Sequence, residues 1–288
     1  MYAKKSLGQN FLNSPQAIAK IVETGKIVPG EIVLEVGPGK GVLTEALLLK
    51  GAKVFAVEKD DNLIPLLEGK FQKEIEEGRF TLVHKDVLEF DPKEHGLETR
   101  KYKLIANIPY YITGIFLRNF LSGKSQPSDM VLMVQKEVAE RIVARGKTTK
   151  SFKKGKDKTP ETISKGKESI LSMSVKVYGE PKYIQTVKAG SFVPAPNVDS
   201  AILSIENISK DFFGNFNEEL FFELLKTGFA GKRKMLSNNL RNFYDTHTEL
   251  FKNRTLVEVL SEASIPEKVR AEDLALLDWK KILETLSK

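Results

Sequence analysis

The stretch "EIVLEVGPGKGVLTEALLLKGAKVFAVE", residues Glu31–Glu58, decides the fold of this chain. Its two ends are short, Val-rich runs of the kind that form buried strands, and its middle has the apolar spacing of a helix. Three glycines, Gly37, Gly39 and Gly41, stand where the first run gives way to the helix. A strand, a glycine-rich turn, a helix and a second strand in this order predict a parallel α/β sheet that binds a nucleotide at the turn.

The same alternation continues to Gln135. After the opening stretch come "DNLIPLLEGKFQKEIEEG", "FTLVHKD", "KYKLIAN", a helix near 114–121, "DMVLMVQ" and "KEVAERIVA". This pattern predicts a parallel sheet with helices on both faces. The runs "ESILSMSVKVYG", "EPKYIQTVKAGSF" and "VDSAILSIENI" follow without helices between them, so we expect strands that finish the sheet with an antiparallel edge.

The apolar pattern changes beyond Ile208. From about Asn217 onward only helical spacing is present, which predicts a small all-α second domain. A length of 288 residues suits one large domain and one small domain. We therefore expect domains at 1–210 and 211–288, joined near "DFFGNFN".

Composition excludes several classes of protein. Hydrophobic residues make up 41% and charged residues 29%, which is typical of a soluble globular chain. No apolar run is long enough to cross a bilayer and the first residues lack the apolar centre of a secretory signal, so we expect a cytoplasmic protein. The chain has no Cys, and His84, His95 and His247 are scattered, so we expect no metal site.

The net charge of +7 and the pI near 9.2 favour a polyanionic partner. The charge is local, because residues 145–168, "RGKTTKSFKKGKDKTPETISKGKE", contain nine basic and three acidic residues.

Carboxylates follow successive strands beside the glycine turn. Glu35 lies two residues before the turn, Glu58 ends the second strand, and Asp86 closes the third in "VHKDVL". An acid at the position of Glu58 can accept hydrogen bonds from ribose hydroxyls, and Asp86 could accept from an adenine amino group. The glycine spacing is G-x-G-x-G rather than the G-x-G-x-x-G of dinucleotide enzymes. The set predicts a site for S-adenosylmethionine, with an oxidoreductase as the competing interpretation.

The stretch "NIPYYITG" (Asn107–Gly114) follows the fourth strand, at the sheet edge where such proteins bind ligands. Pro109 biases Ile108 toward extended geometry, which can turn the Ile108 carbonyl into the cleft. The side-chain oxygen of Asn107 and this carbonyl would then form two acceptors beside the ring of Tyr110. That combination suits the exocyclic amine of a flat base.

Adenine N6 is a poor nucleophile because its lone pair is conjugated with the ring. Two acceptors that draw its hydrogens out of the ring plane would aim the lone pair at a sulfonium methyl, so orientation and electrostatics suffice and no general base is needed. The base must be unpaired or swung out and held by aromatic rings. Tyr110 could supply one ring and Phe192, in "SFVPAPNVDSAI", the other, although Phe192 could equally be a core residue. Tyr111 fits packing better than chemistry.

Seven motifs, six of them in order along the first domain, resemble the bacterial small-subunit rRNA adenine dimethyltransferase family. They are "SLGQNFL", "LEVGPGKGVLTEALL", "VFAVEKD", "NIPYYIT", "MVQKEVAERI", "FVPAPNVDSAI" and "IPEKVRAEDL", and the similarity runs from about Lys4 to the C-terminus. The resemblance implies a Rossmann-like class I methyltransferase with a mostly parallel seven-stranded sheet. It also implies two methyl transfers from S-adenosylmethionine to N6 of each of two adjacent adenosines in the 3′-terminal hairpin loop of 16S rRNA, late in 30S subunit biogenesis.

The resemblance further implies roles for single residues. Asn10 and Leu12 would close over the donor, Gly37 would contact its methionine part, Glu58 its ribose and Asp86 its adenine, with Asn107 between donor and acceptor. From the residues alone, "LGQNFL" reads only as an exposed lead-in to a helix that starts near Pro15.

One segment departs from the family pattern. A Lys-rich insertion at about 146–168 replaces a short loop that contains a Tyr-Gly pair. It is either an added phosphate-binding arm or a solvated loop. In the helical domain, "GKRKMLSNNLR" places four cations, Lys232, Arg233, Lys234 and Arg241, that we expect to bind the RNA backbone, with a merely solvated helix face as the alternative.

Two rival functions stay open. The same pocket could methylate adenosine in 23S rRNA or adenine in DNA, or the protein could be an assembly factor whose binding to the immature 30S subunit matters more than its chemistry. We expect a monomer that binds neither metal nor membrane.

Overall fold

The computed structural model of the 288-residue chain describes residues 8–149 and 162–288. Its contacts divide the chain into two compact units. The first comprises Met1–Ala139 and Tyr178–Ser209, and the second comprises Glu140–Val177 and Lys210–Lys288. Residues 140–177 thus belong with the C-terminal helices, whereas the sequence placed the boundary at 210 alone.

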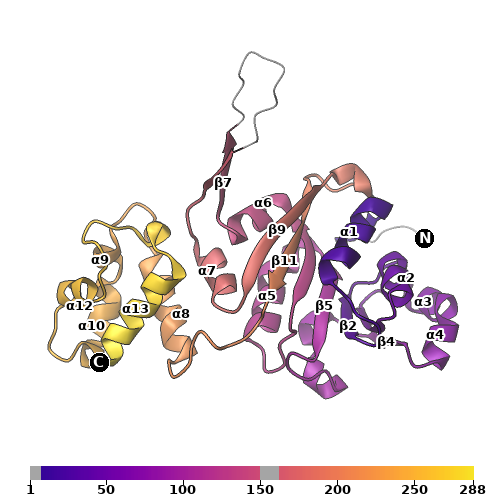
Figure 1. Ribbon diagram of the computed structural model, residues 1–288, viewed down its shortest axis with the longest axis horizontal. Helices are drawn as coiled ribbons and strands as arrows, with labels where there is room; N and C mark the ends of the chain where they lie inside the picture. The colour runs from indigo at the N-terminus through magenta and orange to yellow at the C-terminus, as the bar shows by residue number, and fades with distance from the viewer. Residues whose placement is uncertain (1–7, 150–161) are drawn as a thin grey trace, which may run out of the picture. The chain divides into compact units, whose positions relative to one another are not determined.

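The first unit is built on a seven-stranded sheet in the order β4-β3-β2-β5-β6-β11-β9 (Figure 1). The strands are β2 (Ile32–Val36), β3 (Lys53–Glu58), β4 (Phe80–His84), β5 (Tyr102–Asn107), β6 (Met130–Gln135), β9 (Glu180–Val187) and β11 (Ser200–Glu206). Neighbours from β4 to β6 pair in parallel, while β11 pairs antiparallel with both β6 and β9. The mostly parallel α/β fold is confirmed, but the antiparallel strand β11 lies inside the sheet and β9 forms the edge.

Helices pack on the sheet because its central strands are apolar on both faces. Every residue of β6 from Met130 to Val134 is buried, as expected for a strand covered from two sides. The helices of this unit are α1 (Pro15–Gly25), α2 (Val42–Leu49), α3 (Ile64–Lys70), α4 (Gln72–Glu76) and α5 (Thr113–Ser122), with α6 (Lys136–Ile142) at the boundary between the units. Helix α1 packs on α2 and lies against β5, β6 and β11.

The run "DNLIPLLEGKFQKEIEEG" forms two helices rather than one. The break falls at Phe71, whose backbone leaves helical geometry and whose buried ring packs 5.0 Å from the ring of Phe80. Burial of this aromatic ring, which helical spacing alone does not register, accounts for the interruption.

The expectation of a strand in "ESILSMSVKVYG" was wrong, because Ile170–Lys176 form helix α7. The side chain of Ser169 accepts from the backbone N–H of Ser172, and the side chain of Ser172 accepts from the backbone N–H of Ser169. This reciprocal capping box starts a helix and outweighs the β-rich composition of the run.

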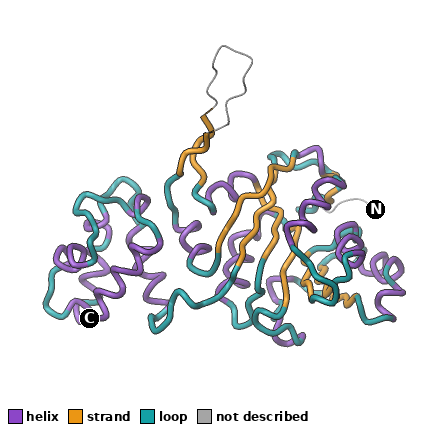
Figure 2. The backbone as a smooth tube through the Cα atoms, in the orientation of Figure 1, coloured by secondary structure: helices purple, strands orange, loops and turns teal. Residues whose placement is uncertain are grey.

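The second unit contains a hairpin and a group of helices, and beyond Ser209 Figure 2 shows helix and loop. The hairpin pairs β7 (Arg145–Thr149) with β8 (Thr162–Lys165), and residues 150–161 of the proposed phosphate-binding arm lie outside the described residues. The helices are α8 (Glu218–Gly228), α9 (Leu236–Asn239), α10 (Arg241–Thr246), α11 (Thr248–Phe251), α12 (Leu256–Glu262) and α13 (Leu276–Ser287).

The core of the helical part forms around Trp279, which is fully buried on α13. Its ring stacks on Phe229 with centroids 5.7 Å apart. A Cβ at Gly228 would stand 2.4 Å from the Trp279 ring, so the close approach of α8 to α13 requires glycine there.

In the described part of the chain, no helix has the length and apolarity that a membrane span requires.

Candidate functional site

The glycine turn after β2 forms the floor of the site. Gly37, Gly39 and Gly41 all have positive φ, the left-handed region that favours glycine. A Cβ at Gly39 would stand 3.0 Å from the ring of Phe11, and one at Gly41 would stand 2.5 Å from Phe71. The turn therefore needs glycine both for its backbone angles and for the close approach of two aromatic rings.

Two hollows open at the carboxyl edge of the parallel strands. The first has a volume of about 170 Å³, and its walls include Asn10, Gly37, Glu58, Asp86, Asn107, Ile108, Pro109 and Tyr110. The second, of about 200 Å³, is lined by Leu12, Glu35, Lys40, Val193 and others. Phe11, Gly37, Gly39 and Asn107 line both. The structure thus brings together every residue that the sequence placed around the donor.

The amide of Asn107 has a defined orientation between the two hollows. Its Nδ2 donates to the backbone carbonyl of Asn10 at 3.1 Å. A carbonyl can only accept, so the amide nitrogen must face Asn10 and the side-chain oxygen must face the other way. The side-chain oxygen of Asn107 is therefore the amide atom that Asn10 leaves unengaged, on a residue that lines both hollows.

Tyr110 is held at its hydroxyl and at its backbone. Its hydroxyl lies 2.6 Å from Oγ of Ser200, and its backbone carbonyl accepts from the Thr113 hydroxyl at 3.0 Å. Burial raises the pKa of the Tyr110 hydroxyl, although the bond to Ser200 opposes the shift. The hydroxyl therefore stays protonated near neutral pH, and the group offers a ring rather than a base.

The N-terminal segment 8–13 crosses the site. Strand β1 (Phe11–Leu12) pairs antiparallel with β10 (Phe192–Val193), and the side chain of Gln9 donates to Asp60 at 2.7 Å. The ammonium of Lys40 lies 5.1 Å from the centre of the Phe11 ring. Residue-by-residue reading missed this closure, because the segment is too short to show a periodic pattern, and only the family resemblance indicated it.

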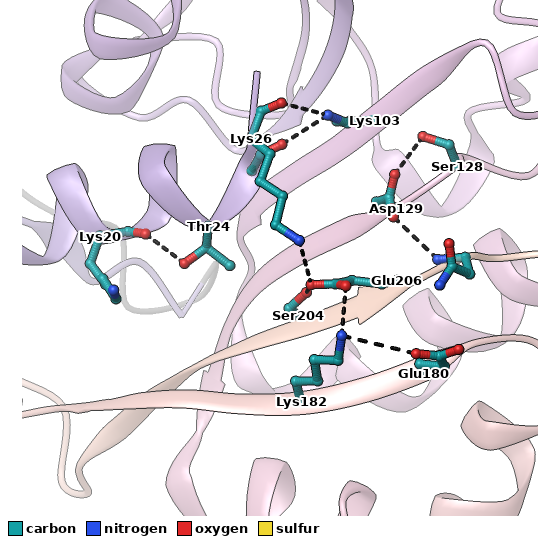
Figure 3. A network of polar contacts seen from close by, with 12 residues as sticks. Lys20, Thr24, Lys26, Lys103, Ser128, Asp129, Glu180, Lys182, Ser204 and Glu206 are labelled. Atoms are coloured by element: carbon teal, nitrogen blue, oxygen red, sulfur yellow. Dashed lines mark hydrogen bonds and ion pairs between the residues drawn. The ribbon is translucent and has the colours of Figure 1, made fainter. Parts of the chain in front are cut away.

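The far end of α1, the helix that follows this segment, is fixed by a polar network (Figure 3). Nζ of Lys103 donates to the carbonyls of Gly25 and Lys26, at 3.0 and 2.9 Å, and pairs with Glu31 at 3.1 Å. Lys26 reaches across to Glu206 on β11. Because a cation at a helix C-terminus is favourable, the network stabilises α1 against the sheet.

Glu58 is buried at the end of β3 and already accepts three backbone hydrogen bonds. Oε1 accepts from Lys59 and Asp60, each at 2.9 Å, and Oε2 accepts from Gly39 at 3.2 Å. Burial raises the pKa of Glu58, and these three donors oppose the rise. Of the roughly four acceptor positions on a carboxylate, one on Oε2 is left for a ligand hydroxyl.

Asp86 has both a structural and an electrostatic partner. Its side chain accepts from the Leu88 amide at 3.0 Å and pairs with Lys59 at 2.6 Å. Partial burial acts to raise the pKa of Asp86, but Lys59 and the Leu88 amide outweigh it and lower that pKa. A ligand amino group would share this charged carboxylate with Lys59.

Glu35 is the most perturbed carboxyl of the site. Burial is the main cause that raises the pKa of Glu35, to about 8. The hydrogen bond from the Thr44 hydroxyl opposes this rise, and the nearby charge of Glu58 adds to it. Its Oε2 accepts from Thr44 at 2.7 Å, whereas its buried Oε1 has no hydrogen-bond partner among the described residues. A buried oxygen without a partner, in the wall of the second hollow, indicates a place for a ligand donor.

Two other aromatic residues differ in their placement. Phe192 is 2% exposed, packs in the hydrophobic core and is not among the described residues that line the two hollows. Its role as a clamp for a base stays a prediction. Tyr111 is 66% exposed, lines the first hollow and packs against Gly8.

The predicted cations of the helical unit are exposed. Lys232, Arg233 and Lys234 precede α9, and Arg241 begins α10. The backbone N–H of Leu236 donates to the carbonyl of Val269 at 2.8 Å, which brings this segment beside exposed Lys268 and Arg270. We call these six residues the helical-unit cation cluster. Within the described residues, none of the six has an ion-pair partner.

Comparison with known proteins identifies the family. A sequence model described as ribosomal RNA adenine dimethylase matches residues 1–155 and 156–284. The chain belongs to the ribosomal RNA adenine dimethylase family. Two relatives named "Ribosomal RNA small subunit methyltransferase A" come from Dehalococcoides mccartyi and Enterococcus faecalis. They are 39% and 40% identical to this chain, respectively. The alignments cover 97% and 99% of this chain, and 87% and 90% of the two relatives.

Solved structures agree with the family fold. A dimethyladenosine transferase from Plasmodium falciparum matches with a TM-score of 0.74 and 25% identity, over 95% of this chain and 96% of that one. The 23S rRNA methyltransferase ErmE matches with a TM-score of 0.70 and 22% identity, over 97% of this chain and 100% of that one. This second match shows a likeness of fold alone. The chain is therefore a class I methyltransferase by fold and by family.

The methyl donor of this family, S-adenosylmethionine, fits the two hollows. Glu58 and Asp86, which suit a ribose and an adenine, line the first hollow. The second is lined by Glu35, a carboxyl that suits an ammonium and whose Oε1 has no hydrogen-bond partner among the described residues. Gly37 lies between them and leaves the backbone open to close approach. The described residues show no group of three or more His, Cys, Asp or Glu that could hold a metal ion.

Proposed function

We propose that this protein methylates N6 of two adjacent adenosines in the 3′-terminal hairpin loop of 16S rRNA, twice each, within the immature 30S subunit. The membership in the dimethylase family and the small-subunit names of the relatives support this substrate. The observation that carries the chemistry is the fixed amide of Asn107, which lines both hollows and whose nitrogen donates to Asn10, so that its oxygen is turned away from Asn10. The protein acts as a monomer late in subunit assembly.

The donor is held by acidic groups and open backbone. Glu58 accepts from a ribose hydroxyl, Asp86 from the adenine amino group, and Glu35 from the ammonium of the amino-acid tail. Gly37 contacts the methionine part, while Asn10 and Leu12 close over it. When bound, S-adenosylmethionine supplies an electrophilic methyl group on a positively charged sulfur.

The acceptor side works by orientation. The side-chain oxygen of Asn107 and the backbone carbonyl of Ile108 accept the two hydrogens of the N6 amino group and draw them out of the plane of the base. The nitrogen then regains a lone pair that points toward the donor methyl. The methylated nitrogen carries an acidic proton that passes to water, so the reaction needs no protein base.

The base itself rests against the ring of Tyr110. A base inside a stacked helix cannot reach the cleft, so the adenosine must be unstacked and held against an aromatic face. Pro109 stiffens the backbone beside this ring, with φ −58° and ψ 134°. In the second unit, the helical-unit cation cluster binds RNA phosphates, because its exposed cations have no protein partner in the described part of the chain.

The direct test uses small subunits from cells that lack the endogenous methylation. Incubation with this protein and labelled donor should produce paired dimethyladenosines in the terminal 16S fragment, read by mass spectrometry. Label in 23S rRNA or in DNA, with none in 16S rRNA, would refute the proposal and favour the rival substrates.

The variant Asn107→Ala separates catalysis from an assembly role. Methyl transfer should fall by orders of magnitude while binding to the subunit, measured by sedimentation, persists. Asn119→Ala, on the exposed side of α5, is the matched control and should leave both unchanged. Loss of binding together with activity in Asn107→Ala would count against the assignment.

A further inference from the structure

In the "DSAI" run, Asp199 directly precedes β11 and Ser200 begins it. Ser200 contacts Tyr110 in the wall of the first hollow, and Asp199 contacts the turn that leads into β10. Ser200 pairs with Gln135 on β6 and with Val187 on β9, so its backbone is held from both sides by the sheet. It is fully buried. A side chain on such a rigid frame can impose its geometry on whatever it touches.

Ser200 touches Tyr110. The two hydroxyl oxygens are 2.6 Å apart, although the residues are 90 positions apart in sequence. A tyrosine ring held only by apolar packing can shift and tilt, but one whose hydroxyl bonds to a fixed partner has a preferred tilt and depth. The Thr113 hydroxyl holds the backbone carbonyl of the same residue. Tyr110 is therefore fixed at both ends, and the Ser200 end is the one set by the sheet.

Asp199 holds the turn that leads into β10. Its Oδ1 accepts from the backbone N–H of Ala189 at 3.2 Å, and its Oδ2 pairs with Lys188 at 2.8 Å. The hydrogen bond from Lys188 is the largest cause that lowers the pKa of Asp199, and the bond from the Ala189 amide lowers it further. The backbone carbonyl of Asp199 also accepts from the N–H of Lys136, just after β6. The turn and Tyr110 are thus both tied to the chain at the start of β11.

We propose that Ser200 is a positioning residue for methyl transfer, which fixes the face of Tyr110 against the substrate base, and that Asp199 fixes the neighbouring turn and β10. The proposal rests on the proposed function, because it assigns Tyr110 the role of the wall for the acceptor base. A preset ring lowers the entropy lost when the base enters and keeps its amino group in line with Asn107.

The test of Ser200 is a double-mutant cycle with Tyr110. Ser200→Ala and Tyr110→Phe each remove one side of the same bond, so each should lower kcat on unmethylated small subunits by roughly tenfold. Donor affinity, measured by calorimetry, should change by less than about twofold. The double variant should be no slower than the slower single variant, because both changes remove one interaction. Additive losses would overturn the proposal.

Ser204→Ala is the matched control. Ser204 is also buried on β11, four residues further along the strand, and among the described residues its hydroxyl makes only a long contact, 3.4 Å, to Glu206. It should leave kcat unchanged. If Ser200→Ala lowered kcat no more than Ser204→Ala, the proposal would fail. Should Ser200→Ala not fold, Tyr110→Phe keeps the ring and the core intact, and a normal kcat for that variant would overturn the proposal by itself.

A second readout is independent of methyl transfer. In protein labelled with ¹³C on its tyrosine rings, aromatic relaxation should show a lower order parameter for the Tyr110 ring in Ser200→Ala than in the wild type, because the ring can tilt more freely. An unchanged order parameter would refute the positioning role even if activity fell. If instead wild-type protein transferred no methyl group while the order parameter fell in the variant, the proposed function would be wrong and the structural part of this inference would stand.

Asp199 has its own control. Asp199→Ala removes both the ion pair and the bond to the Ala189 amide, whereas Lys188→Met removes the ion pair alone. Because Lys188 is exposed, the amide bond carries the effect, and Asp199→Ala should raise KM for the small subunit several-fold while Lys188→Met should not. Equal effects of the two variants, or none for Asp199→Ala, would remove Asp199 from the proposal.

Discussion

The side-chain amide of Asn107 donates to the backbone carbonyl of Asn10 across 97 positions of sequence, at 3.1 Å. This one bond joins the segment that closes over the donor to the group that we propose faces the acceptor. It also fixes which way the amide points. The segment 8–13 therefore orients the side-chain oxygen of Asn107 as well as covering the site. A change at residue 107 that breaks this bond should therefore affect both donor affinity and methyl transfer.

The variant Asn107→Asp tests this link. An aspartate has nearly the same shape, but its carboxylate cannot donate to the Asn10 carbonyl and is repelled by it. We expect methyl transfer to fall at least about a hundredfold and donor affinity to weaken about tenfold, since losing the bond loosens the covering segment. Calorimetry and single-turnover kinetics measure the two effects. Asn119→Asp, on the exposed side of α5, should show neither, and tight donor binding in Asn107→Asp would contradict the link.

Glu35 should make the stability of the protein fall as pH rises. Its pKa in the folded protein is about 8 and its ordinary value is 4.5, so the folded state binds a proton that the unfolded state releases. The stabilising contribution is complete below the unfolded value and is lost as pH rises through the folded value, at no more than about 1.4 kcal/mol per pH unit. The charge of Glu58 raises the pKa of Glu35 and the charge of Lys70 lowers it, so both groups affect the pH at which this stability is lost.

Glu35→Gln should flatten that dependence. The amide cannot ionise, so the midpoint of urea unfolding should vary less with pH between 5 and 8 in the variant than in the wild type. Glu68→Gln, an exposed change on α3, should keep the wild-type profile. Donor binding gives a second measurement: if Glu35 accepts from the donor ammonium as a carboxylate, wild-type protein should release a proton on binding at pH 7 and the variant should not. A wild-type profile for Glu35→Gln would show that Glu35 is ionised in the folded state.

Lys103 should contribute to stability through the C-terminus of α1. Its side chain is 13% exposed and donates to two carbonyls at the end of α1 (Figure 3). It also pairs with Glu31. Lys103→Met keeps the stem but leaves these acceptors without their cation, so we expect a loss of about 1–2 kcal/mol in the free energy of unfolding. Lys101→Met, an exposed neighbour in the chain, should change it little. Equal stability of the two variants would show that the network adds nothing.

The sequence predicted the parts of the site that depend on where strands end. Gly37, Glu58, Asp86 and Asn107 each follow a recognisable strand, and parallel strands bring their carboxyl ends to one edge. The contact of Ser200 with Tyr110 joins residues 90 positions apart, and no local pattern encodes it. Helix α7 was missed for a related reason, since its capping box is two serines in a run of strand-like composition.

The helical-unit cation cluster should set part of the salt dependence of RNA binding. Replacing Lys232, Arg233 and Lys234 together by Gln removes three exposed charges, so the slope of log K against log salt concentration should become shallower by roughly 0.7 to 0.9 for each phosphate that the protein no longer neutralises. A charge-matched control replaces Lys252, Lys280 and Lys281, which lie elsewhere in the helical unit. Filter binding of 30S subunits across a salt series measures both. If the control shifts the slope as much as the cluster does, then net charge, rather than this surface, draws the RNA.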